Sequence, residues 1–234
     1  MRKLLNNIVA AASIFLAATT LAVSAQQEVD WYNDSNIVSD VLYRGGYTIS
    51  VLSIDDVSVL RVDGLIDAST AGYLFYFYQV MSPQYIALSG PGGAMSGGLA
   101  IHNLIQTIDA KVVILPKDFC ISACAFAAIA SNDLVIEGLL GFHVPYFTHI
   151  DPAVPMNKYV NDAMLMTWEI IKIMQDANFT NSAIDYIMYD TSQGQYAVVD
   201  SVIKIKQLTN ADIDASMILK LMSDVDVNKW IKER

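Results

Sequence analysis

Apolar and polar positions alternate along the middle of the chain in two rhythms. Short runs rich in β-branched residues end at turn residues, whereas longer runs carry apolar residues at spacings of three and four. The short runs predict strands over 57–62, 85–89, 111–115, 133–136 and 139–142, and the longer ones predict helices over 68–81, 97–108 and 122–130. Strands that alternate with helices of this length pair in parallel, with the helices on the faces of the sheet. The pattern therefore predicts an α/β fold.

The segments on either side follow other patterns. Residues 26–56 begin with a polar stretch that contains Gly45 and Gly46, and they predict an irregular lead-in segment rather than a separate domain. Two prolines after residue 150 break the chain. Helical spacing then predicts a long helix over 156–175 and shorter helical stretches over 181–189 and 212–232. Residues 57–234 are therefore expected to form one domain whose C-terminal part is a mainly helical arm.

The first 25 residues have the pattern of a cleavable secretory signal. Two positive charges in 1–3 precede an apolar and small-residue run over 8–23, and Val23-Ser24-Ala25 supplies small side chains at a cleavage site. A membrane anchor is the alternative, but the run has about 16 residues against the roughly 20 that a spanning helix needs. We expect cleavage near Ala25, a mature chain in the periplasm or secreted, and no membrane span after cleavage.

Composition limits the partners and cofactors. The net charge of −10 and the sequence pI near 4.5 argue against a nucleic-acid partner, which requires a positive surface. Two cysteines cannot complete a four-ligand metal site, and the three histidines lack the paired spacing of structural zinc. We therefore expect no metal and no cofactor. Cys120 and Cys124 are predicted either to pair in a local disulfide or to remain as two buried thiols.

Three junctions that follow predicted strands carry residues that could bind a ligand or catalyse a reaction. Each of these residues could also have a purely structural role. Gly90-Pro91-Gly92-Gly93 is either a tight turn or a loop that points backbone amides at a ligand, and it matches no phosphate-loop pattern. Ser122 is either a helix cap or a nucleophile, and His143 is either structural or a general base. Because carboxyl ends of parallel strands meet at one sheet edge, the three together predict an acyl-transfer site.

The same segments resemble a known family. Gly64-Leu65-Ile66, Leu88-Ser89-Gly90-Pro91-Gly92-Gly93, Gly97-Gly98-Leu99-Ala100-Ile101, Cys120-Ile121-Ser122-Ala123-Cys124-Ala125 and Gly141-Phe142-His143 stand in the order found in the Clp-protease-like serine peptidases of the ClpP/crotonase superfamily, over roughly residues 57 to 150. The exported, periplasmic branch is the most similar. The resemblance implies a spiral of ββα units with a helical arm, a peptide or protein substrate, and assembly into a homo-oligomer.

Residue by residue, the resemblance implies that Ser122 is the nucleophile and His143 the general base. It also implies that the amides of Gly92 or Gly93 and of Ala123 form the oxyanion hole. If Cys120 and Cys124 pair, the bridge would fix the turn that aims the serine. A serine peptidase with a Ser-His(-Asp) site is the function predicted.

The third member of the triad is missing from its usual place. The family's acid lies just ahead of a helix like 208–216, where this chain has Lys204-Ile205-Lys206. Asp190 and Asp200 are the nearest candidates, and each is equally well explained as a solvated loop residue. A Ser-His dyad, or a catalytically inactive Clp-like binding or assembly module, is the alternative.

The other features fit less specific roles. His102 is predicted to be structural, and His149 is predicted to lie on a loop near the site. Acyl-CoA chemistry of the crotonase kind ranks last, because such thioesters belong to the cytoplasm and no basic residue is placed to meet a nucleotide phosphate.

Overall fold

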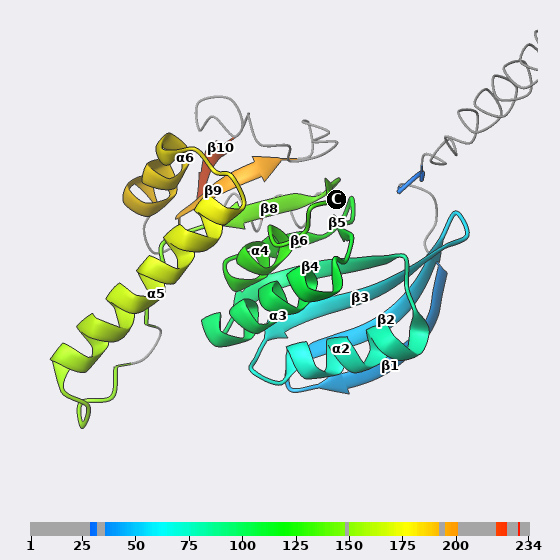
Figure 1. Ribbon diagram of the computed structural model, residues 1–234, viewed down its shortest axis with the longest axis horizontal. Coiled ribbons are helices and arrows are strands. Elements are labelled where there is room, and N and C mark those ends of the chain that lie inside the picture. Colours follow the sequence, from blue (N-terminus) through cyan, green and yellow to red (C-terminus); the bar gives the residue numbers. More distant parts are fainter. Residues whose placement is uncertain are drawn as a thin grey trace, which may run out of the picture.

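The computed structural model describes residues 29–31, 36–147, 150–191, 195–200, 219–223 and 229. Its central feature is one sheet, whose strands follow the spatial order β1-β2-β3-β4-β6-β8-β9-β10 (Figure 1). Off this path, β5 pairs with β4, and β7 pairs with β5. The strands are β1 (Asn36–Arg44), β2 (Tyr47–Ile54), β3 (Val57–Ile66), β4 (Tyr85–Gly93), β5 (Val112–Ile114), β6 (Phe119–Ile121), β7 (Leu134–Ile136), β8 (Leu139–Phe142), β9 (Gln195–Asp200) and β10 (Leu219–Ser223).

The pairing changes from the centre of the sheet to its edges. The contacts β3–β4, β4–β5, β4–β6, β5–β7 and β6–β8 are parallel, and helices α2 (Thr70–Met81), α3 (Met95–Ile108) and α4 (Ala123–Ala128) connect these strands. The outer pairs β1–β2, β2–β3, β8–β9 and β9–β10 are antiparallel. The predicted α/β fold with parallel central strands is confirmed, and the antiparallel edges were not predicted.

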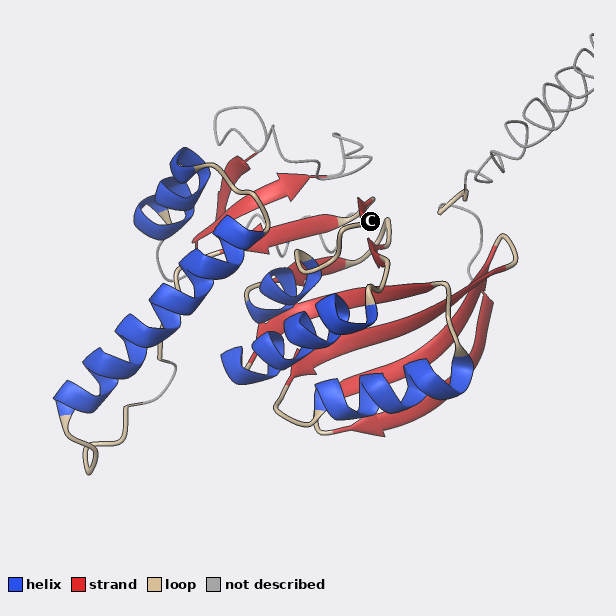
Figure 2. Cartoon of the chain, viewed as in Figure 1, coloured by secondary structure: helices blue, strands red, loops and turns tan. Residues whose placement is uncertain are grey.

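Successive side chains of each strand point to opposite faces of the sheet, and the two faces differ in what they contact. On one face, side chains such as Leu60, Leu88 and Leu140 join a large core with apolar residues of the helices. Figures 1 and 2 show α2, α3 and α4 along this same side of the sheet. The opposite face carries two smaller apolar clusters, one that includes Val59 and one around Ile121 and its neighbours on β8 and β9. The helix-covered face therefore holds the main core.

The prediction of an irregular lead-in over 26–56 is wrong at residues 36–44 and 47–54. Residues 36–44 and 47–54 form β1 and β2, which pair as a hairpin, and β2 then pairs with β3. In β2 the odd positions Tyr47 and Ile49 enter the main core, whereas Leu52 and Ile54 enter the cluster on the opposite face. Both faces of β2 carry buried apolar residues, and serines and a threonine stand between them. The sequence of β2 therefore lacks the simple alternation of apolar and polar residues by which a strand is recognised.

In the C-terminal part, the described residues form helices up to 190 and strands at 195–200 and 219–223. Helix α5 (Met156–Asp176) closely matches the predicted long helix, and α6 (Asn181–Asp185) with the π-helical turn η1 (Tyr186–Asp190) covers the next predicted stretch. Strands β9 and β10 then follow, so the predicted helix over 212–232 is wrong at 219–223. Its other positions, except 229, lie outside the described residues, as does the predicted signal over 1–25.

Helix α5 extends away from the sheet like an arm, as Figure 1 shows. Its C-terminal part packs on the core through Ile170, Ile173 and Met174. Among the helices that the structure describes, none combines the length and the apolar character that crossing a membrane requires.

Candidate active site

Ser122 occupies a sharp corner between β6 and α4. Its backbone angles are φ 59° and ψ −127°, which a residue with a side chain adopts rarely and at a cost. The Ser122 N–H donates to the carbonyl of Gly141 on β8 at 2.9 Å. Its side chain makes no capping hydrogen bond to α4. The helix-cap alternative therefore does not explain this serine, and strained corners of this kind gather at functional sites.

Helix α4 is shorter than the sequence predicted. It spans six residues from Ala123, against the predicted 122–130, and the preceding strand β6 was not predicted at all. Such a short helix adds little dipole field at Ser122. The corner itself, rather than the helix dipole, is what distinguishes this serine.

A disulfide closes over the Ser122 corner. The Sγ atoms of Cys120 and Cys124 are 2.02 Å apart and their Cα atoms 5.2 Å apart. Both cysteines are buried, one at the middle of β6 and one in α4. Of the two alternatives that the sequence left open, the structure has the bonded form. The bridge ties the strand to the helix across the serine, and so restricts the corner between them.

The glycine-rich segment lies directly against this corner. It belongs to β4 rather than to a free loop, and a bulge at Gly90-Pro91 separates the paired positions Asp63↔Ser89 and Leu65↔Gly92. A Cβ on Gly92 would lie 2.8 Å from the Cβ of Ser122 and 2.9 Å from the backbone nitrogen of Ala123. Only a glycine fits such an approach.

The two glycines proposed for the oxyanion hole are thereby distinguished. Gly92 touches the Ser122 corner, whereas a Cβ on Gly93 would meet the carbonyl oxygen of Ile66 on β3 at 2.2 Å. The structure thus brings Gly92, Ser122 and Ala123 together and places Gly93 on the β3 side.

His143 follows the end of β8, the parallel neighbour of β6. The register pairs Ile121 with Gly141, so Ser122 and His143 leave adjacent strands at the same edge of the sheet. The histidine is 7% exposed, and its Nδ1 lies 2.7 Å from the carbonyl oxygen of Val144. The rings of Tyr146 and Tyr196 contact it, with centroids 5.2 and 5.3 Å away.

The hydrogen bond to Val144 distinguishes the two nitrogens of the His143 ring. Nδ1 is engaged by the carbonyl oxygen, so the two ring nitrogens have different surroundings.

The backbone register separates the two candidate acids. Asp200 pairs with Leu139, which lies four residues before His143 along β8, or about 13 Å at the rise of a strand. Asp190 is the last residue of η1 and directly precedes Thr191, whose hydroxyl accepts a hydrogen bond from the Val144 N–H at 2.9 Å. The backbone near Asp190 is thus close to His143. The side chains of both aspartates, and residues 201–218, lie outside the described part of the chain.

The other two histidines are separate from this corner. His102 on α3 is buried, and its Nδ1 lies 2.9 Å from the carbonyl oxygen of Phe126 on α4. Burial lowers the pKa of His102, which keeps the ring neutral. These contacts agree with a structural role that joins two helices. His149 lies outside the described residues.

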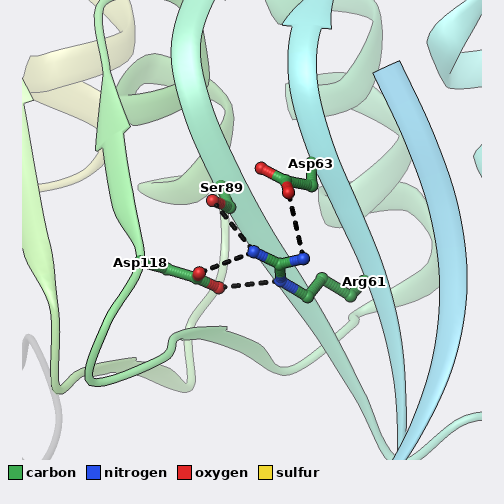
Figure 3. A network of polar contacts seen from close by, with 4 residues as sticks. All are labelled: Arg61, Asp63, Ser89 and Asp118. Atoms are coloured by element: carbon green, nitrogen blue, oxygen red, sulfur yellow. Dashed lines mark hydrogen bonds and ion pairs between the residues drawn. The ribbon is translucent and has the colours of Figure 1, made fainter. Parts of the chain in front are cut away.

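A polar network on the face opposite the helices was missed by the sequence analysis. Arg61 on β3 bonds both carboxylate oxygens of Asp118, at 3.0 and 2.7 Å, and Asp63 at 3.0 Å (Figure 3). Its NH2 group also reaches the Ser89 hydroxyl at 3.4 Å. Burial lowers the pKa of Arg61, but the hydrogen bonds and charges of its two aspartates raise it overall. The network ties the segment before β6 to the sheet and keeps the cation paired.

Metal ligands do not gather in the described residues. No group of three or more histidine, cysteine, aspartate or glutamate side chains there could hold an ion. The Ser122 corner offers a hydroxyl and backbone amides, and His143 leaves the adjacent strand at the same edge.

Comparison with known proteins gives no family assignment. No protein-family model matches the sequence, and no curated protein matches it either. Among solved structures, a mutant of the 1510-N membrane-bound stomatin-specific protease is similar, with a TM-score of 0.42 and 16% sequence identity. The similarity covers 56% of this chain and 69% of that one.

Proposed function

We propose that this protein is a serine peptidase in which Ser122 is the nucleophile and His143 the general base. The observation that carries the proposal is the Ser122 corner: a serine with φ 59°, not used as a helix cap, with the backbone of Gly92 packed against its Cβ. His143 leaves the next parallel strand at the same edge. The same proposal includes membership of the exported Clp-like peptidases of the ClpP/crotonase superfamily and their spiral fold of ββα units.

The hydroxyl, the imidazole and the backbone amides act in both halves of the reaction, acylation and deacylation. The Ser122 Oγ attacks a peptide carbonyl carbon while its proton passes to Nε2 of His143, and a tetrahedral oxyanion forms. The backbone N–H groups of Gly92 and Ala123 stabilise that oxyanion. The C–N bond then breaks and the proton goes from His143 to the leaving amine. Water then attacks the acyl-enzyme carbonyl carbon while its proton passes to His143. The bond to the Ser122 Oγ breaks, the proton returns to that oxygen, and the carboxylic acid product leaves.

The identity of the third group remains a prediction. Asp190 is the better of the two acid candidates, because its backbone adjoins the residue that bonds Val144. Asp200 on β9 pairs instead with Leu139, four residues before His143. An acid beside the imidazole would orient it and stabilise its charged form.

Hydrolysis of an unfolded protein by the purified mature chain tests the proposal. The wild type should cleave it and should react with a fluorophosphonate probe, whereas Ser122→Ala should do neither. Ser182→Ala, which removes an exposed hydroxyl on α6, is the matched control and should behave as the wild type. A wild type that neither cleaves nor labels, while remaining folded, would overturn the proposal.

A binding or assembly module without catalysis is the second candidate. The feature that favours it is in the sequence: Lys204-Ile205-Lys206 stand where the family's acid is expected. In that case peptides would bind the wild type and Ser122→Ala equally, and neither protein would hydrolyse them.

We also propose that the protein acts in the bacterial periplasm, or outside the cell, after cleavage near Ala25. The proposal is supported by the charge, apolar run and small residues of 1–25. Cell fractionation and N-terminal sequencing test it. A mature chain that begins near Gln26 in the periplasmic fraction is expected, and an uncleaved cytoplasmic chain would contradict it.

A further inference from the structure

The hydroxyl of Thr191 is a buried polar group that the proposed reaction does not use directly. Thr191 is 4% exposed and follows η1. Its hydroxyl donates to the carbonyl oxygen of Ile187 and accepts the N–H of Val144 at 2.9 Å. One side chain thus joins the turn after α6 to the residue that follows His143.

Val144 is held from both sides. Its N–H bonds Thr191, and its carbonyl oxygen lies 2.7 Å from Nδ1 of His143. Pro145 comes next, and a residue that precedes proline is restricted to extended conformations. The direction of the Val144 carbonyl is therefore fixed by a hydrogen bond, a covalent restriction and the histidine itself.

This contact determines which imidazole nitrogen carries the proton. A carbonyl oxygen can only accept, so Nδ1 must be the donor in the bond to Val144. In the neutral ring the lone pair then lies on Nε2, the nitrogen that a general base uses in a serine triad. The carbonyl thus does for the tautomer what an aspartate does in that triad.

We propose that Thr191 is a positioning residue for His143, acting through Val144. Its hydroxyl holds the Val144 segment so that the carbonyl keeps His143 as the Nδ1–H tautomer. This inference rests on the proposed function for its catalytic consequence. It also offers a physical account of a chain that has Lys204 and Lys206 where an acid is expected.

Two substitutions separate the hydroxyl from the shape of the side chain. Thr191→Val keeps the branched shape and removes both hydrogen bonds, whereas Thr191→Ser keeps the hydroxyl. Thr180→Val is the matched control, because the Thr180 hydroxyl accepts from the Ala183 N–H at the start of α6 and so supports a neighbouring helix.

Nitrogen NMR of the imidazole rings gives a readout that needs no catalysis. The sequence has three histidines, so comparison with His143→Gln assigns the signal. We expect the Nδ1–H tautomer in the wild type, Thr191→Ser and Thr180→Val, and a mixture of tautomers in Thr191→Val. An Nε2–H tautomer in the wild type would overturn the proposal without any variant, even if Thr191→Val failed to fold.

Kinetics give the second readout. Thr191→Val should lower kcat at least about tenfold with little change in KM, a smaller loss than removal of the base itself, while Thr191→Ser should restore the rate. Equal rates for the wild type and Thr191→Val would overturn the proposal. If the tautomer shifts as expected but no wild-type sample hydrolyses peptide, the positioning of His143 stands and the peptidase function fails.

Discussion

Ser122 keeps a backbone conformation that costs free energy, and three contacts around it hold that conformation in place. The N–H bond to Gly141, the disulfide between its neighbours and the contact with Gly92 all hold the corner. A positive φ in a residue with a side chain typically costs about 1–3 kcal/mol. The chain therefore gives up stability at the residue that we propose as the nucleophile.

Replacing Ser122 in two ways tests this strain. Ser122→Gly and Ser122→Ala both remove the hydroxyl, but only glycine adopts φ 59° without strain. We expect the glycine variant to have a free energy of unfolding about 1–2 kcal/mol higher than the alanine variant, by urea denaturation, and both to be inactive. An alanine variant as stable as the glycine variant would show that the corner is not strained.

Gly92 offers a second test at a single residue. In Gly92→Ala the new Cβ would overlap the Ser122 corner at a backbone φ of 93°, so the corner must shift. We expect the rate of hydrolysis to fall by at least about 100-fold, the usual effect of losing an oxyanion donor.

Gly72→Ala is the matched control for Gly92→Ala. Gly72 lies inside α2, and a Cβ added there would meet no atom within 4 Å beyond the backbone of its own helix. Activity should therefore be retained, and stability should rise by about 0.5–1 kcal/mol. Full activity in Gly92→Ala would remove this glycine from the site.

At the scale of elements, His102 links α3 to α4 and so supports the helix that begins beside Ser122. Burial lowers its folded pKa below the usual 6.5. As the pH falls below about 6.5, the unfolded chain takes up a proton that the folded chain refuses, so the free energy of unfolding decreases. This contribution is intact above the unfolded pKa and is lost as the pH falls through the folded one.

His102→Asn tests this link, because an amide can still donate to the Phe126 carbonyl but does not titrate between pH 5 and 7.5. Thermal unfolding over that range should show a smaller loss of Tm on acidification in the variant than in the wild type. Parallel curves for the two proteins would show that His102 does not contribute to the acid sensitivity.

Elements with a clear hydrophobic period were predictable from the sequence, and elements without one were not. Strand β8 and helix α5 match their predictions closely because short apolar and long amphipathic runs are distinctive. Strand β6 was missed because three residues are too few to show a period, and β10 because residues 212–232 were interpreted as helical. Strand β9 was missed because its apolar residues follow one another without alternation.

The candidate site divides in the same way. The glycine, serine and histidine junctions follow predicted strands, so the sequence indicated them. Thr191 and the Arg61 network gave no signal, because a threonine or an arginine acquires its role only from the tertiary partner that it meets.

At the scale of the whole molecule, the exposed row along α5 is the surface on which we expect self-association. Met156, Val160, Met164 and Trp168 recur every four residues on this arm and are 51% to 66% exposed. Exposed apolar rows of this kind mark interaction surfaces, and we expect the partner to be a second copy of the chain.

Light scattering tests the association. The wild type should form an oligomer that Trp168→Lys disrupts, whereas Tyr76→Lys should not disrupt it, since this similarly exposed aromatic lies on α2. A wild type that remains monomeric at high concentration would contradict the expectation.

Ser122 and His143 are proposed to act together, and the rate of fluorophosphonate labelling measures this most directly. We predict a single adduct on Ser122, located by mass spectrometry, which forms about 10²–10⁴-fold more slowly in His143→Gln and at the wild-type rate in His102→Asn. An adduct that forms equally fast without the His143 imidazole, or no adduct on Ser122 in the folded wild type, would contradict the account.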